Sequence, residues 1–243
     1  MVLPRMHTQM PTIYLFDIDG TLVSTGGVGR RALEAAFAQR YGQPGNFGFG
    51  FDGMTDRAIV ALALQELRPA VAGGDYESEI DSLLDLYTVA LAAETQSSAH
   101  SFVVHDGAPD VLDALEPVRQ RRAAVVGLGT GNIRRGAEIK LGAVGLYERF
   151  AFGGFGCDHH DRARLLAVGA ARGAALLGRD LANCNVLVVG DTPKDVAAAR
   201  AIGAACLAVA TGRYSQAELR ASGADYTAPT LASPEALRVL LRS

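Results

Sequence analysis

Short apolar runs alternate with longer segments of helical spacing, and this alternation is the strongest constraint on the fold. The apolar runs cover residues 13–16, 123–128, 186–189 and 205–209. The helical segments between them cover residues 109–115, 134–141, 162–177 and 195–202. Strands that alternate with helices favour a parallel sheet with helices on both faces. The sequence therefore predicts a doubly wound α/β fold.

One region interrupts this alternation with three successive helical segments. These segments cover residues 31–41, 56–67 and 77–94, and no convincing apolar strand follows any of them. Gly26, Gly27 and Gly29 offer a flexible exit from the sheet just before the first of them. The sequence therefore predicts a helical domain at residues 25–100, inserted into a core formed by residues 1–24 and 101–243.

The first apolar run ends in two carboxylates, Asp17 and Asp19, followed by Gly20 and Thr21. Ligands of open parallel sheets bind outside the carboxyl ends of the strands. Asp17 is suited to attack phosphorus and form an aspartyl-phosphate. Asp19 is suited to protonate the leaving oxygen and then to deprotonate water. The competing interpretation is an acidic turn after a strand, without catalytic function.

Residues 14–22, Tyr-Leu-Phe-Asp-Ile-Asp-Gly-Thr-Leu, resemble the first signature of the haloacid dehalogenase superfamily. Two further segments, residues 126–132 and 188–195, resemble other signatures of that superfamily in the required order. The resemblance covers nearly the whole chain. It implies a Rossmann-like core, an inserted helical cap and a magnesium-dependent phosphatase similar to phosphoglycolate phosphatases.

In the second segment, the resemblance implies that Thr130 holds a phosphate oxygen. Backbone N–H groups of Gly131 and Asn132 would add donors at the start of the next helix. A dinucleotide-binding fingerprint is the alternative, because Gly127 and Gly129 fit it. Asn132, however, stands where that fingerprint needs its third glycine.

The segment at residues 188–195 contains Gly-Asp followed three residues later by a second aspartate. The resemblance implies that Asp191 binds Mg²⁺ together with Asp17 and the backbone carbonyl of Asp19. Mg²⁺ keeps water and phosphate ligands, so few protein carboxylates suffice. Asp195 is either a further ligand or a helix-start acid that stabilises the helix dipole.

The third signature of the superfamily is a lysine or arginine that offsets the charges of the nucleophile and the phosphate. Arg162 lies closest to the implied position, and Lys140 on the preceding helical segment is the second candidate. The competing interpretation is that both are surface charges of amphipathic helices, as most basic residues are. The sequence leaves the choice between them open.

Two other polar segments invite a functional interpretation. Residues 51–57 resemble the cap loop that faces the active site in helical-cap members, and Arg57 or Asp56 would contact the substrate there. An ordinary helix start capped by Thr55 explains the same residues. Residues 157–161, Cys-Asp-His-His-Asp, resemble part of a zinc site, but the sequence offers no second Cys/His cluster to complete one.

These features predict a phosphatase that acts on a small phosphorylated metabolite. A phosphomutase would use the same residues, and a non-catalytic phosphate-binding module is a third possibility. A dehalogenase is disfavoured, because its pattern lacks the acid at Asp19. The superfamily includes many substrates, so the sequence does not identify the metabolite.

Charge and composition limit the classes of partner and the compartment that we expect for the protein. The formal net charge is -3 and no basic stripe occurs, which argues against a nucleic-acid partner. No apolar stretch is long enough to span a membrane. Three widely spaced cysteines fit a reducing compartment, so we expect a cytoplasmic protein. A monomer and a homodimer remain equally open.

Overall fold

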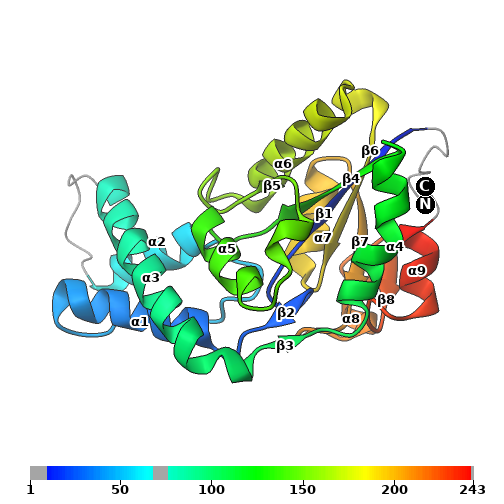
Figure 1. Cartoon of the computed structure of the whole chain (residues 1–243). Helices are drawn as coiled ribbons and strands as arrows, with labels where there is room; N and C mark the ends of the chain where they lie inside the picture. The colour runs from blue at the N-terminus through cyan, green and yellow to red at the C-terminus, as the bar shows by residue number, and fades with distance from the viewer. Residues whose placement is uncertain (1–9, 68–75, 242–243) are drawn as a thin grey trace.

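A six-stranded sheet lies at the centre of the computed structural model, which describes residues 10–67 and 76–241 (Figure 1). Its strands are β1 (Thr12–Phe16), β4 (Ala124–Gly129), β5 (Gly153–Gly154), β6 (Asn185–Gly190), β7 (Ala205–Val209) and β8 (Tyr226–Ala228). All pairings are parallel and the order is β5-β4-β1-β6-β7-β8. The predicted doubly wound sheet is therefore confirmed, and the order reverses at β1, where such sheets bind ligands.

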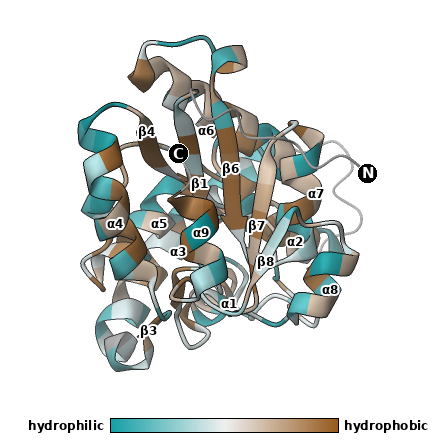
Figure 2. Cartoon of the chain, turned by 90° about the vertical axis from the view of Figure 1, so that its right-hand side faces the viewer, coloured by the Kyte–Doolittle hydropathy of each residue, from teal (hydrophilic) through white to brown (hydrophobic). Residues whose placement is uncertain are grey.

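Helices cover both faces of this sheet. The helices on one face are α4 (Ala108–Gln120), α5 (Arg134–Gly142) and α9 (Pro234–Leu240), and those on the other are α6 (Arg162–Leu177), α7 (Pro193–Ala201) and α8 (Gln216–Ala221). Tyr14 and Phe16 pack into the first layer, whereas Ile13 and Leu15 pack into the second. Burial on both sides explains why the central strands are continuously apolar (Figure 2).

Three further helices stand apart from the sheet: α1 (Val28–Tyr41), α2 (Asp56–Leu67) and α3 (Tyr76–Ser98). They form a hydrophobic cluster of their own around Phe37, Leu83 and Tyr87. The chain enters this region through β2 (Val23–Ser24) and leaves it through β3 (Val103–Val104), and these two strands pair antiparallel. The helices occupy the region of the predicted insertion, although residues 1–9, 68–75 and 242–243 of the two predicted domains lie outside the described residues.

Elements that the sequence did not predict are short. They comprise β2, β3, β5 and β8, helices α8 and α9, and the 3₁₀ turns η1 (Ala99–Ser101), η2 (Tyr147–Arg149) and η3 (Leu181–Asn183). Segments of two to seven residues are too short for a periodic pattern to identify them. Across residues 10–67 and 76–241, the structure contains no helix with the length and apolar character that crossing a membrane requires.

Helix α6 approaches the sheet closely at Gly154 and Gly169. A Cβ atom at Gly154 would overlap the backbone carbonyl of Leu165, and one at Gly169 would lie 2.9 Å from the Gly154 nitrogen. The absence of side chains therefore allows the backbones of α6 and β5 to meet. This contact holds α6 against the sheet, and the first residue of α6 is Arg162.

We expect Gly154→Ala to lower the free energy of unfolding by about 3 kcal/mol, because an overpacked backbone contact must be displaced. Gly142→Ala is the matched control, since a Cβ there would meet nothing within 4 Å. That variant should change the free energy by no more than about 1 kcal/mol. Urea unfolding of both variants measures the difference, and equal effects would contradict the packing argument.

Candidate active site

The loop after β1 presents two aspartates at the carboxyl edge of the sheet. The Asp17 backbone N–H donates to the Val189 carbonyl at 2.8 Å, which extends the pairing of β1 with β6. Ile18 is fully buried, and the loop turns at Gly20, whose φ of +78° favours glycine. Because Ile18 anchors the loop in the core, its neighbours Asp17 and Asp19 both line the cavity above the sheet edge.

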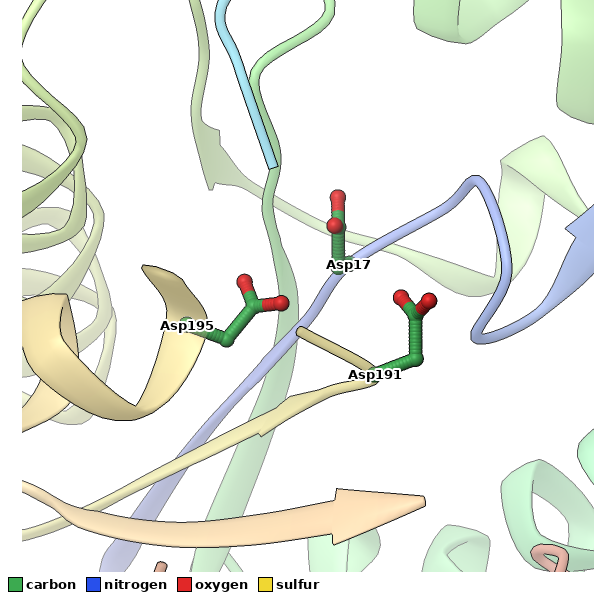
Figure 3. A group of neighbouring side chains, drawn as sticks. All are labelled: Asp17, Asp191 and Asp195. Atoms are coloured by element: carbon green, nitrogen blue, oxygen red, sulfur yellow. The ribbon is translucent and has the colours of Figure 1, made fainter. Parts of the chain in front are cut away.

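Three carboxylates meet at this edge. Those of Asp17, Asp191 and Asp195 come from the ends of β1 and β6 and from the first turn of α7 (Figure 3). One oxygen of each lies within 4.8 Å of the others, and all three residues are buried. Like charges at this separation repel strongly unless a cation lies among them.

Two glycines make room for the Asp191 carboxylate. A Cβ atom at either Gly20 or Gly212 would overlap it. The Thr21 hydroxyl donates to Asp191 Oδ1 at 3.0 Å and fixes its orientation. Gly212, which follows β7 at the same edge of the sheet, was not identified from the sequence.

The cluster fits a divalent cation. Burial raises the pKa of Asp17 to about 6, with Arg162 opposing the shift. Burial, together with Asp195 and Asp17, raises the pKa of Asp191 to about 8. Both shifts reflect buried negative charge that is incompletely offset. Hard oxygen ligands of this kind suit a metal such as Mg²⁺, and the positive charge would relieve the repulsion.

Arg162 is the cation that contacts Asp17. Its Nη2 atom lies 2.5 Å from Asp17 Oδ2 and 2.5 Å from Asp195 Oδ1, and its side chain is 8% exposed. Burial opposes its charge, but the two carboxylates outweigh burial and raise its pKa. Asp195 Oδ1 and Arg162 Nε nevertheless lack a well-aligned hydrogen bond within the described residues. Polar capacity therefore remains for a ligand.

Asp195 has the helix-start role, one of the two roles that the sequence left open. Its Oδ2 accepts hydrogen bonds from the backbone and hydroxyl of Thr192, at 3.0 and 2.7 Å. This arrangement closes a capping box at the start of α7. The other oxygen, Oδ1, faces Arg162 and the acidic cluster.

Lys140 contacts Asp19 instead of Asp17. Its Nζ atom lies 3.0 and 2.8 Å from the two carboxylate oxygens of Asp19, and the lysine is buried. Of the two candidates for the cation beside Asp17, the geometry therefore selects Arg162. Asp19 turns its carboxylate toward Lys140, which leaves its backbone carbonyl as the group that could join the acidic cluster.

Thr130 is fully buried, and its hydroxyl oxygen accepts two hydrogen bonds from Asn132. The backbone and side-chain N–H groups of Asn132 donate to Thr130 Oγ1 at 3.2 and 2.9 Å. The Asn132 backbone N–H therefore contacts Thr130, and its expected contact with phosphate stays a prediction. The Thr130 hydroxyl keeps its own proton for another acceptor, and Gly131 lines the cavity.

A cavity of about 670 Å³ connects this edge to the helical region. Arg30, Phe51, Asp56 and Tyr87 line it from that region. Asp56 also joins the two parts of the molecule, since its Oδ2 accepts the Ile133 N–H at 2.9 Å at the start of α5. Arg30 and Tyr87 were not identified from the sequence, where they look like ordinary positions of amphipathic helices.

Arg57 is not among the residues that line this cavity. Its guanidinium pairs with Glu77 and Asp81 of α3. The charge of Arg57 therefore joins α2 to α3, and the expectation that Arg57 contacts substrate stays a prediction. Thr55 behaves as the alternative predicted, and its hydroxyl accepts the Ala58 N–H at 3.2 Å at the start of α2.

The structure also bears on two alternatives. Gly127 and Gly129 lie inside β4, so they belong to a strand and not to a phosphate-binding loop. Asp158 of the segment at residues 157–161 pairs with Arg172 at 2.6 Å. Within the described ranges, the acidic cluster is the group of side chains close enough together to hold a metal.

Comparisons with known proteins agree with this arrangement. Residues 163–234 match the family described as HAD-hydrolase-like. A hydrolase from Pseudomonas syringae is 20% identical with a TM-score of 0.64, over 92% of this chain and 95% of its own. A predicted phosphoglycolate phosphatase from Haemophilus somnus is 16% identical with a TM-score of 0.60, over 92% and 96%. CbbY from Rhodobacter sphaeroides, in complex with phosphate, is 17% identical with a TM-score of 0.60, over 92% and 96%. No curated protein sequence matches the chain.

We expect Arg162→Met to lower the free energy of unfolding by about 3 kcal/mol or more without added divalent cations, because it leaves buried carboxylates unpaired. Arg164→Met on the same helix is the control, since Arg164 is exposed, and its effect should stay within about 0.5 kcal/mol. Denaturant titration at neutral pH checks both values. A similar small effect of the two substitutions would show that Arg162 does not offset the cluster.

Proposed function

Because the chain has the haloacid dehalogenase-like fold and matches the hydrolase family over residues 163–234, we propose that it is a magnesium-dependent phosphatase that acts through an aspartyl-phosphate. The observation that carries the proposal is the division of labour between Asp17 and Asp19. Each contacts its own buried cation, Arg162 for the first and Lys140 for the second. Two carboxylates in different environments are suited to different roles in one reaction.

Asp17 is the proposed nucleophile. It lies at the strand end with one oxygen held by Arg162, so the other can face an incoming phosphorus atom. Arg162 reduces the repulsion between the carboxylate and the anionic phosphate, and its forked donors can contact both. Mg²⁺, held by Asp17, Asp191, the Asp19 carbonyl and in part Asp195, would supply further positive charge at the transferring phosphoryl group.

Asp19 is the proposed acid and base. Its side chain is 44% exposed, whereas that of Asp17 is 7% exposed, so Asp19 can reach the leaving oxygen and then a water molecule. Thr130 is proposed to donate its hydroxyl proton to a phosphate oxygen, with the Gly131 backbone N–H beside it.

Residues 25–100 are proposed as the cap that covers a small phosphorylated metabolite. The cavity is large enough for such a substrate, and the cap side of its wall combines aromatic with charged side chains. A phosphoglycolate phosphatase from H. somnus shares the fold, but this similarity does not identify the metabolite. We further propose that the protein works in the cytoplasm, as a monomer or homodimer.

The proposal is tested by the hydrolysis of p-nitrophenyl phosphate with Mg²⁺ or with excess chelator. We expect activity with Mg²⁺ alone. Asp17→Asn should lower turnover at least about 10⁴-fold, because the nucleophile is lost while the shape is kept. Asp191→Asn should lose activity at Mg²⁺ concentrations that saturate the wild type.

Three results would contradict the proposal. Wild-type activity in excess chelator would exclude the role of the metal, and full activity of Asp17→Asn would exclude the covalent mechanism. The transfer of phosphate between positions of a sugar, without release of inorganic phosphate, would identify a mutase instead. Far-ultraviolet circular dichroism of each variant controls for loss of the fold.

A further inference from the structure

Lys140 forms an ion pair with Asp19, the residue that is proposed to transfer the leaving-group proton. Lys140 Nζ contacts both carboxylate oxygens of Asp19, and Asn132 Nδ2 contacts Oδ2 at 2.8 Å. The lysine side chain is 6% exposed and the aspartate 44%. Lys140 and Asn132 therefore hold the Asp19 carboxylate by hydrogen bonds, while part of that carboxylate stays open to the cavity.

The helical region lies against the same lysine. A Cβ atom at Gly29 of α1 would lie 3.6 Å from Lys140 Nζ. Asp56 accepts the Ile133 N–H at the start of α5, the helix that carries Lys140. Residues of the helical region therefore lie beside both the start of α5 and the end of the Lys140 side chain.

We infer that Lys140 is a positioning residue that aims the Asp19 carboxyl group at the leaving oxygen and stabilises the carboxylate formed when the proton departs. This inference rests on the proposed function and assigns Lys140 a task separate from the neutralisation of phosphate by Arg162. A positioned acid is worth about 10²- to 10⁴-fold in rate when the reaction needs its proton.

The proton balance defines the step. An Asp17 oxygen forms a bond to phosphorus, the bond from phosphorus to the leaving oxygen breaks, and that oxygen takes the proton of Asp19. The Asp19 carboxylate then takes a proton from water, as the water oxygen bonds to phosphorus and the bond to Asp17 breaks. Lys140 keeps its protons throughout and stabilises the charge on Asp19 between the two steps.

This role predicts a dependence on the leaving group. Benzyl phosphate releases an alkoxide, which must be protonated, whereas p-nitrophenyl phosphate releases a stable phenolate. Lys140→Met should lower kcat/KM, which covers the steps up to the departure of the leaving group, by about 100-fold for benzyl phosphate and by less than about 5-fold for p-nitrophenyl phosphate. A residue that only supports the fold or binds phosphate would affect both substrates equally.

Two variants control the comparison. Arg135→Met alters an exposed residue of the same helix, paired with Glu138, and should leave both turnover numbers unchanged. Lys140→Arg keeps a cation at the position and should hold the ratio of the two kcat/KM values within about 5-fold of the wild type. If Lys140→Met does not fold, Lys140→Gln carries the test with the same expected contrast between the two substrates, and equal losses on both would overturn the inference.

A double variant shows whether Lys140 acts through Asp19. If it does, adding Lys140→Met to Asp19→Asn should lower the turnover of benzyl phosphate no further. An additional loss equal to that of the single variant would overturn the inference. Equal losses on the two substrates would also overturn it. Wild-type protein that hydrolyses neither substrate would instead refute the proposed function.

Discussion

The concentration of negative charge at the carboxyl edge of the sheet is the constraint on which the site depends. In the part of the chain that the structure describes, the buried charged side chains are Asp17, Asp56, Asp191, Asp195, Lys140 and Arg162. All of them line the cavity or contact a residue that does. Burial of so many carboxylates is unfavourable unless cations accompany them. The site therefore holds these charges together at a cost in stability.

The fold makes this arrangement possible through close backbone approaches. The Gly20 and Gly212 positions leave space for the Asp191 carboxylate, and Gly154 lets α6 meet the sheet so that Arg162 reaches Asp17. Gly131 lies against the Met54 carbonyl of the helical region, where a Cβ atom would overlap it. The glycines that allow these close approaches therefore also position the charged side chains of the site. A substitution at one of them would change both the packing and the electrostatics.

Much of the fold follows from sequence patterns, because a strand buried on both faces is continuously apolar and a helix repeats every 3.6 residues. Residues 205–209 and 162–177 were predicted with the bounds that the structure shows. Asp17 and Asp19 were identified from their place at the end of a predicted strand, whereas Asp191 and Asp195 were identified from the resemblance of residues 188–195 to a superfamily signature.

The sequence pattern did not predict contacts between segments that lie far apart in the chain. Nothing in the pattern around Lys140 distinguishes Asp17 from Asp19 as its partner, since the difference depends on how α5 sits above the loop. The ion pairs of Arg57 are a second case, because its partners Glu77 and Asp81 belong to another helix. Asn132 shows a local contact that the sequence did not predict, since its backbone N–H donates to the neighbouring Thr130 hydroxyl near the start of a helix.

The most direct test of the account is to trap the covalent intermediate. Protein quenched during turnover of p-nitrophenyl phosphate with Mg²⁺ can be reduced with borohydride, which converts an aspartyl-phosphate to homoserine, and then mapped by peptide mass spectrometry. The account predicts that the conversion occurs at Asp17, requires substrate, and is absent from Asp17→Asn. Conversion at Asp19 instead, or rapid turnover with Asp17 unmodified throughout, would contradict it.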